Sequence, residues 1–285
     1  GAAHFQGGCA PCHGAPGQPI NPVYDHMLPS PPSLSEHAGE WSDQELFWIV
    51  RHGIQYAGMP AWSGEGRDDE VWAMAAFLRR LPSLDAAAYN RLAQGGAEIP
   101  TRRPGAMANA GLGALHLTAC ARCHDNGADA ASDLAPRLAG QSPIYLQRAL
   151  EEYRNNRRQS GVMEPVAAEL DETQIGQLAE YYGSLAPAPV ATTPEEGAGA
   201  ALALQGDPDK GVPPCGTCHG ASALADYPRL AGQPAPYVAG QLKLWRKGGR
   251  AQTPQGKLMA EIARRLSDEQ IDDVARYYAG AEDVQ

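Results

Sequence analysis

Apolar residues recur at helical spacing in several segments of the chain, and no segment shows the alternating pattern of a half-buried strand. The clearest helical stretch is 68–81. Its apolar face consists of Val71, Met74, Ala75 and Leu78. We therefore expect an all-α chain with essentially no sheet.

Two further helix starts are marked by capping signals. Ser42 is followed three positions later by Glu45, and Ser267 is followed by Gln270. In this arrangement each side chain accepts a hydrogen bond from the other residue's backbone N–H. We expect one helix to begin after Ser42 and another after Ser267.

The second half of the chain contains an internal repeat, because residues 120–185 align with residues 215–280. Both copies hold the sequence Pro-Arg-Leu-Ala-Gly-Gln, at 136–141 and 228–233, and both end in a paired Tyr. The N-terminal part of the chain reads as a more distant third copy. The repeat predicts small helical units in tandem.

Linker-like composition separates the copies. Residues 82–104 are mixed and Gly-containing, and residues 185–194 are rich in Pro, Ala and Thr. We expect three domains, at 1–86, 105–187 and 196–285.

Composition limits what these domains can be. The 285 residues carry a formal net charge of −10 and include only 3 Phe. The acidic balance argues against nucleic-acid binding. Domains this small and poor in large aromatic residues would be marginal alone, which predicts that something besides side chains fills their interiors.

All 6 cysteines fall into three copies of Cys-x-x-Cys-His. The copies are Cys9, Cys12 and His13; Cys120, Cys123 and His124; and Cys215, Cys218 and His219. This is the attachment signature of c-type haem: one helical turn brings two thiols to the two vinyl groups, and the His becomes an iron ligand. Disulfides would not need the His, a zinc site would need four ligands, and a redox pair would occur once. We therefore expect three covalently attached haems c.

A methionine follows each motif at a similar distance and is the candidate second iron ligand. These residues are Met59, Met163 and Met259. A thioether opposite a His stabilises reduced iron and raises its potential. Met27 competes with Met59 in the first domain, whereas Met74 and Met107 are assigned to the core.

The residues around the expected haems suggest supporting contacts. A carbonyl from the proline region after each motif could accept the His ring N–H. Pro136 and Pro228 are the candidates in the last two domains, and 29–32 leaves the choice open in the first; alternatively, these prolines only shape loops. The basic residues at 154, 157, 158, 246, 247 and 250 could pair with haem propionates or form a solvated helix face.

On these residues, 105–285 resembles the di-haem cytochromes of the c-four class, and 1–86 resembles single-domain class I bacterial cytochromes c with Gly-Met-Pro-Ala-Trp around the ligand. The resemblance implies three tandem cytochrome c domains. It implies three ligand pairs: His13 with Met59, His124 with Met163, and His219 with Met259. The third haem departs from the di-haem class and resembles the tri-haem subunits of membrane-bound alcohol and aldehyde dehydrogenases.

The resemblance implies an electron carrier, not an enzyme, that works in the periplasm. Its partners would be a dehydrogenase or quinol-oxidising complex as donor and a terminal oxidase or another cytochrome as acceptor. The alternatives are an obligate cytochrome subunit of a membrane-bound dehydrogenase and, third, a haem enzyme with one open iron.

No apolar run is long enough to cross a bilayer. We expect the sequence to begin inside the native gene product, so that an N-terminal membrane anchor could precede it.

Overall fold

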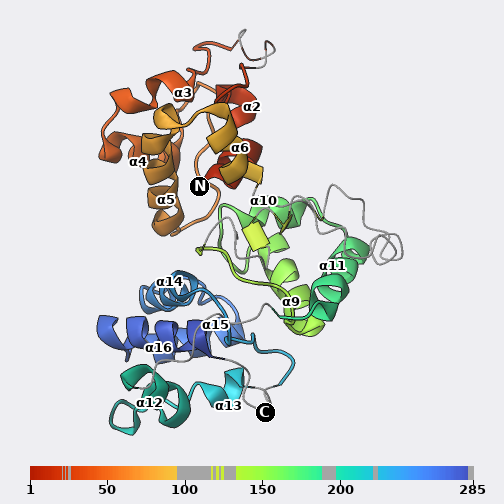
Figure 1. Ribbon diagram of the computed structural model, residues 1–285, viewed down its shortest axis with the longest axis vertical. Helices are drawn as coiled ribbons and strands as arrows, with labels where there is room; N and C mark the ends of the chain where they lie inside the picture. The colour runs from red at the N-terminus through yellow and green to blue at the C-terminus, as the bar shows by residue number, and fades with distance from the viewer. Residues whose placement is uncertain are drawn as a thin grey trace. The chain divides into compact units, whose positions relative to one another are not determined.

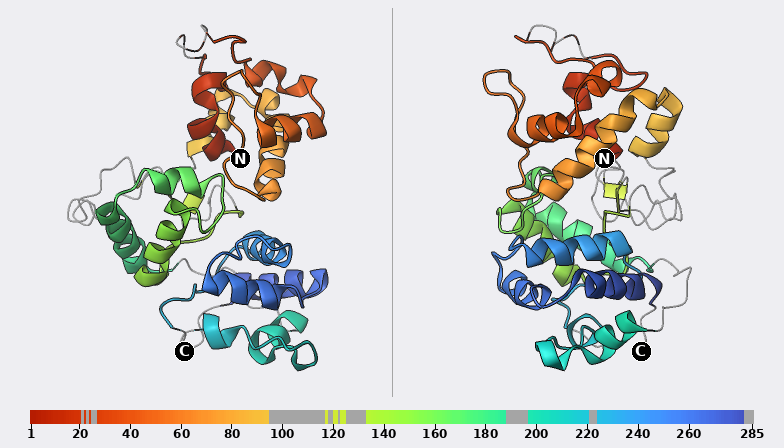
Figure 2. Two further views of the ribbon diagram at one scale, coloured as in Figure 1. Left: turned by 180° about the vertical axis from the view of Figure 1, so that it is seen from behind. Right: turned by 90° about the vertical axis from the view of Figure 1, so that its left-hand side faces the viewer.

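The computed structural model describes residues 1–94, 117–124, 133–187, 197–220 and 224–281, except positions 21, 23, 25, 26, 118, 119 and 122. Within this part of the chain the structure is helical, and the three β-bridges are isolated pairs. Figures 1 and 2 accordingly draw coiled ribbons and no strand arrows. The chain divides into two compact units. The first holds Gly1–Glu98 with Gln159–Pro165, and the second holds Ile99–Arg158 with Val166–Gln285.

The first unit contains six helices in its N-terminal part. They are α1 (Ala2–Gly8), α2 (Ala10–His13), α3 (Leu34–His37), α4 (Asp43–His52), α5 (Asp68–Arg80) and α6 (Ala86–Gln94). The apolar face predicted over 68–81 is confirmed: Val71, Met74, Ala75 and Leu78 are at most 3 % exposed. Met74, Ala75 and Leu78 form a core with Phe5 and Tyr89, and the Phe5 and Tyr89 rings meet edge-to-face.

The predicted capping signals are confirmed as capping boxes. Ser42 caps α4 by accepting from the Glu45 N–H, and Ser267 caps α16 (Asp268–Gly280) by accepting from the Gln270 N–H. Asp171 does the same for α11 (Glu172–Ser184). Each cap satisfies N–H groups that a helix start leaves without a partner, and so fixes where the helix begins.

The second unit contains the two repeats. The second repeat contributes α9 (Pro143–Arg154) and α11, and the third contributes α12 (Ala198–Gln205), α13 (Gly216–His219), α14 (Ala235–Arg246), α15 (Pro254–Ala263) and α16. Helix α10 (Met163–Ala168) begins in the first unit and ends in the second. The paired tyrosines correspond across the repeats, since Tyr182 and Tyr278 are buried in equivalent cores.

The repeated Pro-Arg-Leu-Ala-Gly-Gln sequence joins the two repeats by a reciprocal set of hydrogen bonds. The Gln141 side chain accepts from Arg229 N at 2.9 Å and donates to Arg229 O at 2.8 Å. The Gln233 side chain accepts from Arg137 N at 3.0 Å and donates to Arg137 O at 2.8 Å. Both glutamines are 4 % exposed. The same patch of each repeat therefore recognises its counterpart, as in an isologous interface.

The predicted domain boundaries stay predictions, and residues 95–116, which contain Met107 and part of the first linker, lie outside the described residues. Within the described chain, every helix is too short or too polar to traverse a lipid bilayer.

Replacing Gln141 by Ala should destabilise the pairing of the two repeats. The substitution leaves the partly buried N–H and C=O of Arg229 without these partners, which costs on the order of 1–3 kcal/mol. The free energy of unfolding measured with denaturant should fall by that amount. Gln147→Ala is the control, because Gln147 is exposed on α9 and its one side-chain hydrogen bond within the described residues is to Glu151 at 3.0 Å. Equal losses in both variants would contradict the role of Gln141.

Three candidate haem-attachment sites

A single helical turn displays the first and the third Cys-x-x-Cys-His motif. In the first, His13 N donates to Cys9 O at 3.0 Å at the end of α2, and in the third, His219 N donates to Cys215 O at 3.0 Å at the end of α13. None of the 6 cysteines forms a disulfide. Burial raises the pKa of Cys9 and of Cys215 to about 11, with a further rise from the second thiol of each motif. The first thiol of each of these two motifs is therefore held in its protonated form.

The three histidine rings share one orientation device. Their Nδ1 atoms lie 2.9 Å from Pro32 O at His13, 2.8 Å from Pro136 O at His124, and 2.8 Å from Pro228 O at His219. Because a carbonyl can only accept, Nδ1 carries the proton and the Nε2 lone pair is left for a metal. The prediction for Pro136 and Pro228 is confirmed, and Pro32 is the residue used in the first domain.

Burial also keeps these rings neutral. It lowers the pKa of all three histidines, against a smaller opposing effect of each proline carbonyl. A neutral imidazole with a fixed tautomer is the form that binds iron.

Met59 lies in the loop between α4 and α5. Ile54 N donates to Met59 O at 3.1 Å, and the turn is completed by Gly53 and Gly58 with φ of 65° and 70°, values that favour glycine. The competitor Met27 places its Cε against Gly58. Both methionines of the first domain therefore remain candidates.

Met259 and His219 line the same cavity in the second unit. The cavity has about 510 Å³ of unfilled space, solvent at its mouth included, and its walls come from both repeats. The Tyr227 ring meets the His219 ring edge-on at 6.0 Å between centroids. The predicted pair of the third motif thus faces one common space.

Met163 is the first residue of α10, and its N–H donates to Ser160 Oγ at 3.1 Å. It belongs to the first unit, whereas His124 belongs to the second. Their pairing stays a sequence prediction.

A buried group of arginines and tyrosines borders the His219 cavity. Arg158 is 5 % exposed and lies 4.5 Å from the Tyr153 ring centroid, and Arg250 lies 4.2 Å from that of Trp245. Burial lowers the pKa of Arg250, and the charge of Arg158 lowers it further. The charges of Arg158 and Arg250 repel each other, so an anion beside them would stabilise the group.

The tyrosines of this group respond to the same charges. Burial works to raise the pKa of Tyr145, but the charges of Arg158 and Arg250 outweigh it and the net shift is downward. Burial raises the pKa of Tyr237 to about 12.

Two arginines of this group have buried N–H groups without an acceptor. Among the described residues, these are Arg158 Nε and Arg148 Nη1. Carboxylates of a haem would satisfy such donors, so the residues present fit a haem c. Arg148 was not identified from the sequence, because an Arg within a helix cannot be told from a solvent-exposed residue by sequence alone.

The other basic residues of the two predicted groups lie at the surface. Arg154 pairs with Glu172 at 3.7 Å, and Arg246 pairs with Asp268. Arg157 and Lys247 are exposed. Of the two readings left open by the sequence, anion binding suits Arg158 and Arg250, and a solvated face suits the rest.

The helical fold and the three motifs define a c-type cytochrome. Residues 1–78 match the family described as cytochrome c oxidase, cbb3-type, subunit III, and residues 199–280 match cytochrome c.

Among curated relatives, the thiosulfate dehydrogenase electron acceptor of Stutzerimonas stutzeri is 36 % identical over 222 residues, covering 73 % of this chain and 94 % of the relative. The cytochrome c4 of Thiocapsa roseopersicina is 36 % identical over 167 residues, covering 56 % of this chain and 86 % of the relative. The chain belongs to the cytochrome c4-like family of electron-transfer cytochromes.

Comparison with solved structures supports the same family. The cytochrome c4 of Acidithiobacillus ferrooxidans matches with a TM-score of 0.51 and 33 % identity, covering 57 % of this chain and 98 % of that one. A thiosulfate dehydrogenase from Marichromatium purpuratum matches with a TM-score of 0.51 and 41 % identity, covering 57 % of this chain and 36 % of that one. These relatives make this chain an electron carrier with covalently bound haem c.

Replacing Arg158 by Gln should lower the reduction potential of the haem that it borders. The substitution removes a buried positive charge, and reduced iron carries one positive charge less than oxidised iron. The Coulomb effect is on the order of 1 kcal/mol at an effective dielectric constant near 20, equivalent to tens of millivolts. Spectroelectrochemical titration measures it. Arg154→Gln, at the exposed Glu172 pair, should leave all potentials within error.

Proposed function

We propose that the chain carries three haems c, each ligated by a His and a Met, and passes single electrons between them. The ligand pairs are His13 with Met59, His124 with Met163, and His219 with Met259. The observation that carries the proposal is the common geometry of the three motifs: at each one an imidazole is fixed by a proline carbonyl at 2.8–2.9 Å. Haem iron, when bound, supplies the one-electron chemistry.

The chain's own residues determine how each haem is held. The cysteines Cys9, Cys12, Cys120, Cys123, Cys215 and Cys218 form the thioether bonds, and the proline carbonyls fix the imidazoles. The arginines Arg148, Arg158 and Arg250 offer donors to the propionates. The His219 cavity is lined by aromatic and charged side chains, among them Tyr145, Trp245 and Arg158, and charge interactions at such a partly buried site are stronger than those at the surface.

The reciprocal Gln141 and Gln233 contacts support electron transfer between the last two haems. They hold the two repeats in one fixed arrangement. Fixed spacing means that no domain movement has to precede transfer. The proposal therefore treats the last two repeats as a two-haem relay to which the first domain adds a third haem.

We further propose that the carrier works in the periplasm and accepts electrons from a dehydrogenase. Thiosulfate dehydrogenase is the favoured donor, because two relatives are named as its electron acceptor and a solved thiosulfate dehydrogenase matches at 41 % identity. A terminal oxidase or another cytochrome is the expected acceptor. The match of residues 1–78 to a cbb3-type oxidase subunit supports the first domain as the exit.

The second candidate is a permanent cytochrome subunit of a dehydrogenase complex. The observation that favours it is the thiosulfate dehydrogenase structure, of whose chain the match covers only 36 %. A carrier should separate from the dehydrogenase on gel filtration at moderate salt, whereas a subunit should co-elute with it.

The Met259→Ala variant tests the ligand assignment. It should contain the same three haems per chain as the wild type but lose the Fe–S charge-transfer absorption of one ferric haem and bind carbon monoxide at one reduced haem. Absorption spectra and iron-to-protein ratios measure both. Met74→Leu is the control, because Met74 is 2 % exposed within the α5 core. An unchanged spectrum in Met259→Ala would refute ligation by Met259.

Electron transfer from a reduced thiosulfate dehydrogenase should be fast and should slow as salt is added. The formal charge of −10 favours a donor with a basic docking surface, and salt screens that attraction over about 10 Å at 0.1 M. Stopped-flow reduction of the haems measures the rate. A rate that stays slow and independent of salt would exclude this enzyme as the donor, while the haem count tests the carrier assignment separately.

A further inference from the structure

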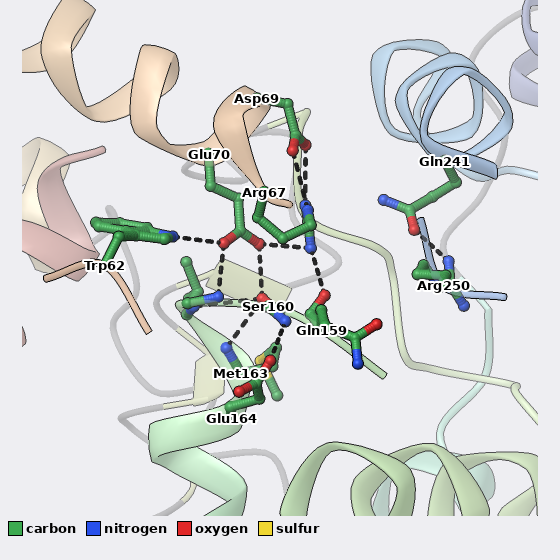
Figure 3. Close-up of polar contacts among 12 residues, drawn as sticks. Trp62, Arg67, Asp69, Glu70, Gln159, Ser160, Met163, Glu164, Gln241 and Arg250 are labelled. Atoms are coloured by element: carbon green, nitrogen blue, oxygen red, sulfur yellow. Dashed lines mark hydrogen bonds and ion pairs between the residues drawn. The ribbon is translucent and has the colours of Figure 1, made fainter. Parts of the chain in front are cut away.

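The segment Gln159–Pro165 belongs to the second repeat in sequence but packs with residues 1–98 in the first unit. The first two residues of the segment are polar and yet buried: Gln159 is 7 % and Ser160 is 3 % exposed. It carries Met163, the proposed ligand of the second haem. Figure 3 shows the polar residues that surround it.

Glu70, in the first turn of α5, is the main partner of this segment. Its carboxylate accepts from Ser160 Oγ at 2.6 Å and from Gly161 N at 2.7 Å. It also accepts from the Trp62 indole N–H at 3.1 Å, so that three donors converge on one side chain (Figure 3). Hydrogen bonds to a charged acceptor are stronger than those between neutral groups.

Arg67 completes the contact. It donates to Gln159 O at 2.8 Å and pairs with Glu70 at 2.7 Å. The side chains of Arg67 and Glu70 are 8 % and 13 % exposed, and Asp69 binds the open side of Arg67 at 2.9 Å. Burial raises the pKa of Glu70, an effect that Arg67 and the three donors oppose. We call Arg67, Glu70 and residues 159–161 the Glu70 cluster.

Ser160 transmits this contact to the ligand. Its hydroxyl donates to Glu70, so its lone pairs are left to accept from Met163 N at 3.1 Å and Val162 N at 3.3 Å. These bonds cap the start of α10, whose first residue is Met163. A carboxylate of the first domain therefore orients the cap from which the ligand helix starts.

The third repeat is built differently. Thr253 caps α15 by accepting from Gly256 N at 3.1 Å, and Met259 lies in the interior of that helix. The cap of the Met259 helix therefore comes from its own repeat. Of these two helices, only α10 starts at a cap that is bonded to Glu70, so the inference concerns the ligand of the second haem.

Trp62 connects the Glu70 cluster to the loop that carries Met59. It follows Met59 by three positions, and a Cβ placed on Gly161 would overlap its indole ring. The backbone of Gly161 thus fits only without a side chain. The loops of two proposed ligands, Met59 and Met163, are fixed to the same group of atoms.

We propose that Glu70 is a positioning residue for the second haem: through Ser160 it fixes the start of α10 and so holds the Met163 thioether in place. Glu70 and Met163 belong to the same unit, so the carboxylate acts on the thioether within that unit. This inference rests on the proposed ligation by Met163.

The test uses the full holoprotein in the variants Glu70→Ala and Ser160→Ala. In Glu70→Ala, amide hydrogen exchange at Gly161 should accelerate by about tenfold or more, because a bond to a charged acceptor is lost. In both variants the Fe–S charge-transfer absorption should weaken by up to the share that Met163→Ala removes. One haem should titrate at a lower potential while the other two stay unchanged.

Asp69→Asn is the matched control. Asp69 binds the same Arg67, is about half exposed, and has no hydrogen bond to residues 159–161 in the described chain. It should leave exchange at Gly161, the absorption and all three potentials as in the wild type. Should Glu70→Ala not fold, Ser160→Ala keeps the buried Arg67–Glu70 pair and tests the same cap.

The outcomes separate the two proposals. If Met163→Ala changes the absorption but neither Glu70→Ala nor Ser160→Ala does, Glu70 has no positioning role. If Met163→Ala itself leaves the absorption unchanged, the ligand assignment is wrong, and with it the positioning of a thioether by Glu70. Exchange at Gly161 then still reports whether Glu70 holds the segment.

Discussion

The hydrogen bond from each proximal His to a proline carbonyl is the contact on which the rest of the structure depends. It fixes the tautomer that leaves Nε2 for iron, and it ties each His to a carbonyl that lies 9, 12 or 19 positions further along the chain. Proline suits this task because its ring restricts the backbone at the acceptor. The position of the proline therefore matters as much as the motif itself, although its separation from the His differs among the three copies.

Sequence duplication and three-dimensional symmetry are directly connected here. Repeating one six-residue sequence places Gln141 opposite the backbone of Arg229 and Gln233 opposite that of Arg137. A self-complementary contact needs only one optimised patch, used twice. The capping boxes and helical periodicity could be predicted because they are local, as could the proline carbonyls, which follow their motifs closely. Partner choice across the repeats could not, because a buried Gln looks like an exposed one in sequence.

The Glu70 cluster illustrates the same limit more sharply. Glu70 stands in an acidic helix start, where sequence alone suggests a favourable contact with the helix dipole and solvent. Its partners lie some 90 positions away, and only the fold reveals that Ser160 and Gly161 reach it. In the first domain, likewise, the sequence presented Met27 only as a competitor of Met59. The fold shows that Met27 lies against Gly58, next to Met59 in the chain.

Charge placement connects these sites to the cofactor. The chain is acidic overall, at −10, yet Arg158 and Arg250 are gathered beside one cavity together with Tyr145 and Tyr237. Arg158 donates to the Tyr145 hydroxyl and Arg250 to the Gln241 side chain, and an anion would offset more of the cost of burying the two guanidinium groups. The haem propionates are the anions that the proposed function provides. The haem would then be a structural counter-ion as well as the redox centre, and the arginines that stabilise the fold would be the same ones that raise the iron's potential.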